Sequence, residues 1–160
     1  MIKKIKSIVV IVFLLSSLPL QSFSQNNELK TYTFNVVDSL NTITPKSMVI
    51  FFHTDWCKYC VQMLSVTLKD KEVIKHLNEN FYFISFDAES NEEVLFAGER
   101  FNFKPSGNNT GVHEITKQLA TIDGNLAYPT LSILNEKYEI IFQRATVLSI
   151  EELILVLEKI

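Results

Sequence analysis

The sequence predicts one α/β domain in which helices flank a central mixed β-sheet. Three observations support this fold class. Short apolar runs typical of buried strands alternate with segments of helical periodicity. The chain closes with two strands joined by a tight turn and a last helix. No internal repeat and no long linker divides it, so a single hydrophobic core is expected.

The elements are predicted in the order β, β, α, β, α, β, β, α. Residues 31–37 alternate aromatic and β-branched side chains, which favours a first strand. The continuous apolar runs at 48–52 and 81–86 are typical of strands buried on both faces. Residues 57–68 show helical spacing, and Asp70 is placed to cap a further helical piece.

The second half contains an irregular insertion near residues 88–110. Within it, 94–96 and 100–103 are predicted to pair as a hairpin around Gly98-Glu99, and 105–111 is predicted to be a turn-rich loop. A helix is expected over 111–122, then strands over 130–134 and 139–143. Ser149 and Glu152 have the spacing of a capping box and predict the start of the last helix.

The N-terminus predicts export. Lys3, Lys4 and Lys6 precede a short apolar run, and a polar stretch with small residues ends at Ser24. We therefore expect residues 1–24 to be a cleaved signal peptide and residues 25–160 to form the mature domain, periplasmic or secreted. A retained N-terminal anchor is the alternative, which the shortness of the apolar run disfavours.

The net charge of the chain restricts the classes of partner that it can bind. Cleavage would remove three lysines and no acid, taking the formal charge from −3 to −6. That balance argues against nucleic acid and against an anionic membrane surface. We expect a monomer.

The chain has only two cysteines, Cys57 and Cys60. A disulfide between them closes a very small loop and would constrain little of the unfolded chain, so the pair is better explained by chemistry. At a helix N-terminus, backbone N–H groups and the helix dipole favour the thiolate of Cys57. Cys57 would attack a substrate disulfide, and Cys60, one turn later, would release the product.

Metal binding is the alternative use of these cysteines. Zinc requires about four ligands, and beyond the two cysteines the chain offers three scattered histidines, His53, His76 and His113. His53 is the one plausible third ligand, although a core position in its strand is expected instead. A module that delivers copper or another soft metal therefore remains the second hypothesis.

The Trp56-Cys57-Lys58-Tyr59-Cys60 motif between a strand and a helix, followed later by Tyr128-Pro129-Thr130, resembles the thioredoxin superfamily. The resemblance implies a thioredoxin fold, a cis Pro129 beside the sulfurs and no bound cofactor. It implies a substrate groove shaped by Trp56, Lys58, Tyr59, Tyr128 and Pro129. Residues 55–60 followed by Met63, together with the expected helix start at 111–114, further look like exported thioredoxin-like proteins common in Bacteroidetes.

Two positions depart from that pattern. Thioredoxins carry a buried aspartate six residues before the first cysteine, where this chain has Phe51. The dipeptide between the cysteines is Lys58-Tyr59, in which Lys58 either stabilises the thiolate or is an ordinary solvated charge. We therefore expect a periplasmic thiol–disulfide oxidoreductase that reduces or exchanges disulfides in exported proteins, with a membrane thiol reductant as candidate electron donor.

Overall fold

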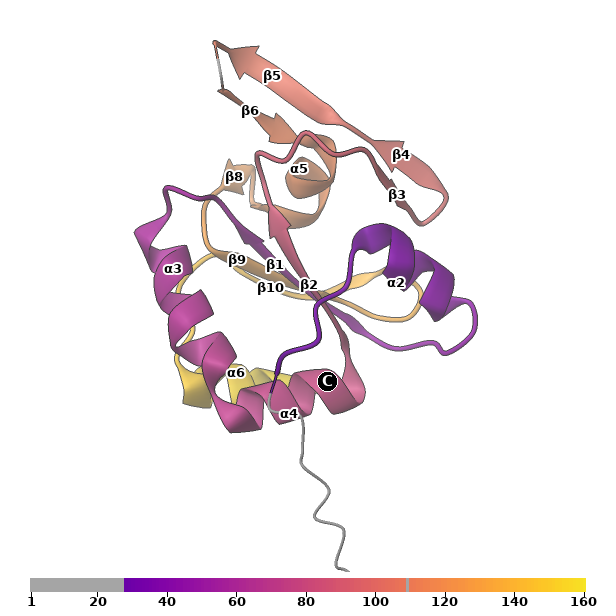
Figure 1. Cartoon of the computed structure of the whole chain (residues 1–160), viewed down its shortest axis with the longest axis vertical. Coiled ribbons are helices and arrows are strands. Elements are labelled where there is room, and N and C mark those ends of the chain that lie inside the picture. Colours follow the sequence, from indigo (N-terminus) through magenta and orange to yellow (C-terminus); the bar gives the residue numbers. More distant parts are fainter. Residues whose placement is uncertain (1–27, 109) are drawn as a thin grey trace, which may run out of the picture.

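The computed structural model describes residues 28–108 and 110–160 and is built around a four-stranded sheet of order β10-β9-β1-β2. β1 (Met48–His53) pairs in parallel with β2 (Tyr82–Asp87) and antiparallel with β9 (Thr130–Leu134). β10 (Ile140–Arg144) continues the sheet antiparallel to β9 (Figure 1). This is the predicted mixed sheet, and its four strands lie close to the predicted ranges.

β1 lies inside the molecule and divides its core in two. Its side chains alternate, so that Val49 and Phe51 join one hydrophobic cluster while Met48, Ile50 and Phe52 join the other. All five are completely buried. The residue that ends this strand is therefore held by packing on both faces of the sheet.

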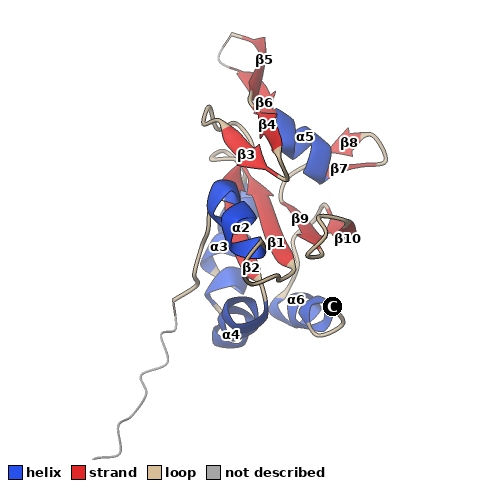
Figure 2. Cartoon of the chain, turned by 90° about the vertical axis from the view of Figure 1, so that its right-hand side faces the viewer, coloured by secondary structure: helices blue, strands red, loops and turns tan. Residues whose placement is uncertain are grey.

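Helices α3 (Lys58–Ser65), α4 (Lys71–Asn80) and α6 (Ile150–Leu157) cover the face that includes Phe51 (Figure 2). A short 3₁₀ helix, η1 (Thr67–Lys69), joins the first two. Asp70 caps α4 through its Oδ1, and Ser149 and Glu152 form both hydrogen bonds of a capping box at α6. Both predicted helix caps, Asp70 and the Ser149–Glu152 capping box, are confirmed.

The first predicted strand is wrong. Residues 31–37 form only one parallel bridge, Thr31 to Phe83, before helix α2 (Phe34–Asn41) begins. Thr33 caps this helix by accepting a hydrogen bond from the Val36 N–H. Phe34 and Val37, three residues apart, are both buried under the other face of the sheet, so helical burial prevails over the local alternation.

The insertion folds as two hairpins. β3 (Val94–Phe96) pairs with β4 (Glu99–Phe101), which confirms the predicted hairpin. The two-residue turn is at Ala97 and Gly98, both at positive φ, so it lies one residue before the predicted Gly98-Glu99 turn, and the second strand is Glu99–Phe101 rather than 100–103. The predicted loop at 105–111 is wrong, because β5 (Phe103–Gly107) pairs with β6 (Thr110–His113). This second hairpin extends beyond the rest of the fold (Figures 1 and 2). A Cβ on Gly111 would overlap the Phe103 ring and lie 2.5 Å from the Lys104 carbonyl oxygen, so only glycine permits this close pairing.

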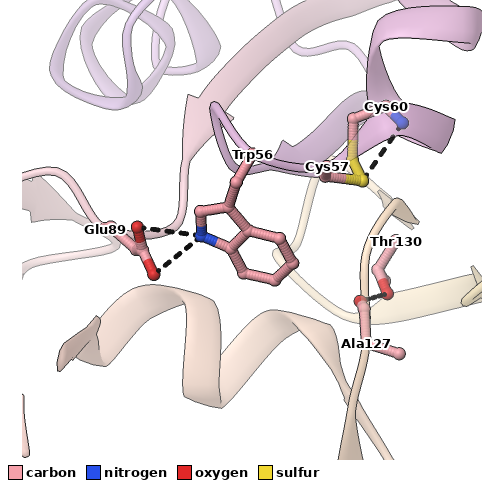
Figure 3. The surroundings of a disulfide bond; sticks show 6 residues. All are labelled: Trp56, Cys57, Cys60, Glu89, Ala127 and Thr130. Atoms are coloured by element: carbon pink, nitrogen blue, oxygen red, sulfur yellow. Dashed lines mark hydrogen bonds between the residues drawn. A yellow bond between two sulfur atoms is a disulfide. The ribbon is translucent and has the colours of Figure 1, made fainter. Parts of the chain in front are cut away.

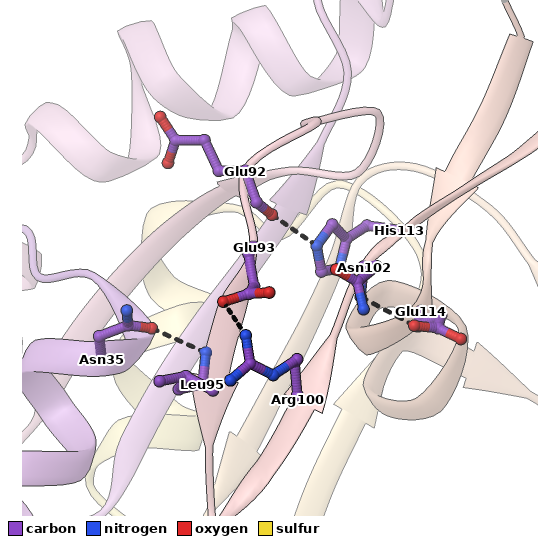
Figure 4. Close-up of polar contacts among 8 residues, drawn as sticks. All are labelled: Asn35, Glu92, Glu93, Leu95, Arg100, Asn102, His113 and Glu114. Atoms are coloured by element: carbon purple, nitrogen blue, oxygen red, sulfur yellow. Dashed lines mark hydrogen bonds and ion pairs between the residues drawn. The ribbon is translucent and has the colours of Figure 1, made fainter.

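Polar contacts join the insertion to its neighbours. The Asn35 side chain in α2 accepts from the Leu95 N–H at 2.9 Å, and Glu114 accepts from the Asn102 N–H at 2.8 Å (Figure 4). Arg100 and Glu93 form an ion pair across the outer surface. The insertion is thus held by one side chain from α2, which precedes it in the sequence, and by one from the helical residue Glu114, which follows it.

His113 is buried where the insertion meets helix α5 (Glu114–Ala120). Its Nδ1 accepts from the Ile115 N–H, so Nε2 carries the proton and donates to the Glu92 carbonyl oxygen at 2.9 Å. This cap starts the helix at Glu114, three residues after the predicted start. The helix ends at Ala120, where the small hairpin β7 (Thr121–Ile122) and β8 (Asn125–Leu126) follows.

The predicted signal peptide, residues 1–24, lies outside the described residues. Within residues 28–108 and 110–160, no helix has the length and apolar character needed to span a membrane.

Replacing His113 with alanine should lower the free energy of unfolding by about 2–4 kcal/mol, because a buried side chain, a helix cap and a link to Glu92 are lost together. Urea denaturation followed by circular dichroism measures this change. His76→Ala on the half-buried side of α4 is the matched control and should cost less than about 1 kcal/mol. Equal losses in both variants would contradict the anchoring role of His113.

Candidate active site

The two cysteines lie at the junction of β1 and α3 and form a disulfide, with Cα atoms 5.2 Å apart. Cys57 is the N-cap of α3, and its backbone N–H donates to the Thr54 carbonyl oxygen at 3.2 Å, which closes the turn after the strand. The Cys60 N–H donates to Cys57 Sγ at 3.1 Å. The sulfur of Cys57 therefore occupies the capping position, where the first N–H groups of a helix lack internal partners.

The two sulfur-bearing residues differ in burial. Cys57 has 5% of its surface exposed, whereas Cys60 is completely buried. Both belong to the hydrophobic cluster that contains Phe51, which is also completely buried. The position six residues before Cys57 thus supplies an apolar ring to the cluster around the disulfide, with no group that could accept a proton.

Trp56 extends from this junction into solvent, with 66% of its surface exposed. Its Nε1 donates to both carboxylate oxygens of Glu89, each 3.2 Å away (Figure 3). The edge-to-face contact with Tyr128, whose ring centroid is 6.0 Å away, holds the indole from a second direction. The ring next to the disulfide therefore has a fixed orientation despite its exposure.

The Tyr128–Pro129 peptide bond is cis, as expected from the resemblance, and Pro129 is buried. Thr130 Oγ1 donates to the Ala127 carbonyl oxygen at 2.7 Å and closes the loop around the proline (Figure 3). Tyr128 packs against the cluster that contains both cysteines. Burial, with the negative charges of Glu89 and Asp87, raises the pKa of Tyr128 to about 12, so its hydroxyl stays protonated.

Lys58 and Tyr59, the residues between the cysteines, are both exposed on the first turn of α3. Tyr59 has 65% of its surface exposed. The structure therefore brings Trp56, Tyr128 and the disulfide into one region and leaves Lys58 and Tyr59 on its solvent side.

The histidines have separate environments. His53 ends β1 beside Asp87 of β2 and stacks on Phe51, with ring centroids 5.6 Å apart. It is half-buried, and His113 is the helix cap described above. Across the described part of the chain, no three His, Cys, Asp or Glu side chains are grouped as a metal site would require. The arrangement gives no geometric support to the metal hypothesis.

Glu89 was not predicted from the sequence as a site residue. It comes two residues after the end of β2, within a segment predicted only as irregular. The usable signal was the parallel pairing of β1 and β2, because the carboxyl ends of parallel strands meet at one edge of a sheet. Polar residues just after β2 are therefore expected near the motif that follows β1.

The family model described as a thioredoxin-like domain matches residues 40–160. The chain therefore belongs to the thioredoxin-like domain family, and the predicted thioredoxin fold is confirmed. A comparison with curated proteins finds no match.

Solved structures agree on the fold. A thioredoxin from Thermus thermophilus is 20% identical with a TM-score of 0.59, and the match covers 82% of this chain and 85% of that one. A DsbH oxidoreductase is 15% identical with a TM-score of 0.54, covering 84% and 86%. The oxidised DsbD C-terminal domain of Neisseria meningitidis is 18% identical with a TM-score of 0.53, covering 81% and 98%.

The environment of His53 predicts a pH dependence of stability. Burial lowers its pKa below the ordinary value of 6.5, although Asp87 and Asp55 act in the opposite direction. The unfolded chain therefore binds this proton at a higher pH than the folded chain does. This difference in the pKa of His53 leaves the free energy of unfolding unchanged well above pH 6.5. It lowers the free energy of unfolding as the pH falls through and below that value.

His53→Gln should accordingly lose less stability than the wild type between about pH 7.5 and about pH 5. Urea denaturation at the two pH values measures the difference, and the other titrating groups cancel in the comparison. Equal losses of unfolding free energy in the two proteins would show that folding does not lower the pKa of His53.

Proposed function

We propose that this chain is an exported thiol–disulfide oxidoreductase that reduces or exchanges disulfides in other exported proteins. The observation that carries the proposal is the Cys57–Cys60 disulfide at the N-terminus of α3, in a chain of the thioredoxin-like domain family. A disulfide across one helical turn adds little stability, so its value lies in being opened and closed.

Cys57 is the attacking residue in this proposal. It retains some exposure, and in the reduced protein the Cys60 N–H and the N-terminus of α3 are placed to stabilise its thiolate. The thiolate bonds to one sulfur of a substrate disulfide and displaces the other. Cys60 then attacks Cys57, which releases the reduced substrate and restores the intramolecular disulfide. Two electrons pass from the protein dithiol to the substrate.

The groove would lie between Trp56 and the loop containing Pro129. Proline has no backbone N–H, so this part of the loop offers no donor to compete for the thiolate. An extended substrate segment could pair with the backbone next to this loop as an added strand. Tyr59 and Lys58 would border the groove on the solvent side.

The names of structural neighbours support the choice of chemistry. One is a DsbH oxidoreductase, and the DsbD C-terminal domain of Neisseria meningitidis is known in reduced and oxidised forms. A periplasmic or secreted location rests on the predicted signal peptide at residues 1–24. A membrane-bound thiol reductant is the proposed electron donor, and exported disulfide proteins are the proposed substrates.

Single cysteine variants test the assignment of roles. Cys60→Ser keeps the attacking thiol but cannot release the substrate, so with insulin it should accumulate a mixed disulfide that appears on a non-reducing gel. Cys57→Ser should accumulate none. In both variants, insulin reduction should fall to the rate given by dithiothreitol alone. Equal trapping by the two variants would contradict the assignment of Cys57 as the attacking residue.

A further inference from the structure

An exposed aromatic face lies in a fixed orientation next to the disulfide. Trp56 directly precedes Cys57, and its indole N–H is held by Glu89 (Figure 3). The ring also makes an edge-to-face contact with Tyr128. Because the orientation is fixed before a ligand arrives, binding to this ring would cost little further conformational entropy. Two thirds of the residue nevertheless faces solvent.

Negative charge reaches this region from different segments of the chain. Glu89 follows β2, Asp87 ends it, and Asp55 lies in the turn after β1. Glu89 and Asp87 both act on the hydroxyl of Tyr128, and Asp87 and Asp55 both act on the ring of His53. The carboxylates therefore share one environment at the sulfur-bearing edge of the sheet.

Glu89 has acceptor capacity to spare. Its two oxygens share a single N–H of Trp56, whereas a carboxylate offers about four acceptor positions. A cation placed over the indole would be attracted by the ring face and by this carboxylate together. Lys58, the one cation within the 54–60 motif, is exposed, so its opposing charge is largely screened by water.

Building on the proposed oxidoreductase function, we propose that Trp56 and Glu89 select substrates with a lysine or arginine next to the cysteine that Cys57 attacks. The aliphatic or guanidinium part of that side chain stacks on the indole, and its charge faces Glu89. An acidic residue at the same place meets the carboxylates and is disfavoured. The selection acts on the substrate class and leaves the thiol chemistry of Cys57 and Cys60 as described.

Three blocked peptides test this selection. Each contains one cysteine flanked on both sides by lysine, glutamine or glutamate and is supplied as its disulfide dimer. The pre-reduced protein is mixed with each dimer, and the rate of a single turnover is followed by Trp56 fluorescence and by mass spectrometry. Because flanking charge alters the leaving thiol, each rate is divided by the rate at which dithiothreitol reduces the same dimer.

We expect the normalised rate to be roughly three- to tenfold higher for the lysine peptide than for the glutamate peptide at low salt. Glu89→Gln still offers an oxygen to the Trp56 N–H but lacks the charge, and it should lower this ratio by at least about twofold. Glu92→Gln is the matched control, because it removes the same charge from the same insertion and leaves the backbone carbonyl that contacts His113 unchanged. It should keep the wild-type ratio.

A wild-type ratio near one, or equal reductions of the ratio in Glu89→Gln and Glu92→Gln, would overturn the selection while leaving the oxidoreductase function intact. Failure of the protein to react with any of the three dimers would instead refute the proposed function itself. Near-ultraviolet circular dichroism of the sole tryptophan checks that Glu89→Gln keeps the indole in its orientation.

Discussion

The site depends on the hydrogen bond from the Cys60 N–H to the sulfur of Cys57. This bond makes Cys57 the cap of α3, so the start of the helix and the position of the Cys57 sulfur are the same structural feature. It can form because β1 ends at His53 and the turn that follows is closed by a hydrogen bond from the Cys57 N–H to the Thr54 carbonyl oxygen. Complete burial of residues 48–52 in the strand before it keeps that turn in place.

The parallel pairing of β1 with β2 extends this constraint to the insertion. His53 lies opposite Asp87 in the register, so the segment after β2 begins beside the turn that leads to Cys57. Glu89 is consequently within reach of Trp56, although 33 residues separate them in sequence. The hairpins that follow are fixed to α2 and α5 through Asn35 and Glu114. The insertion is therefore connected to the site at one end and to the core at the other.

Much of this could be predicted from the sequence, because local signals and tertiary packing agree. The apolar run of β1, the cap at Asp70 and the capping box at Ser149 each determine an element almost by themselves. The cysteines were singled out by their number and spacing, and Trp56 by the resemblance to the thioredoxin superfamily. Residues 31–37 misled because their alternation also fits helical burial of Phe34 and Val37, which only the sheet behind them decides.

The second hairpin and Glu89 were missed for a different reason. The 105–111 segment has the proline, glycine and asparagine content of a loop, and its pairing relies on the Phe103 ring lying over Gly111. A contact between distant residues of this kind leaves no periodic pattern in the sequence. The same is true of the hydrogen bond between Trp56 and Glu89, which exists only once two strands are parallel.

Negative charge near the disulfide lies at the edge of the sheet and not in the core, where Phe51 is located. A buried carboxylate at position 51 would face a large desolvation cost and would act on Cys60 from within the core. Here that position is an apolar ring, and the acidic groups Asp55, Asp87 and Glu89 lie at the partly solvated edge instead. At that edge a carboxylate retains much of its hydration and can interact with an incoming substrate. The negative charge of this site is therefore better placed to discriminate among substrates than to accept the proton of Cys60.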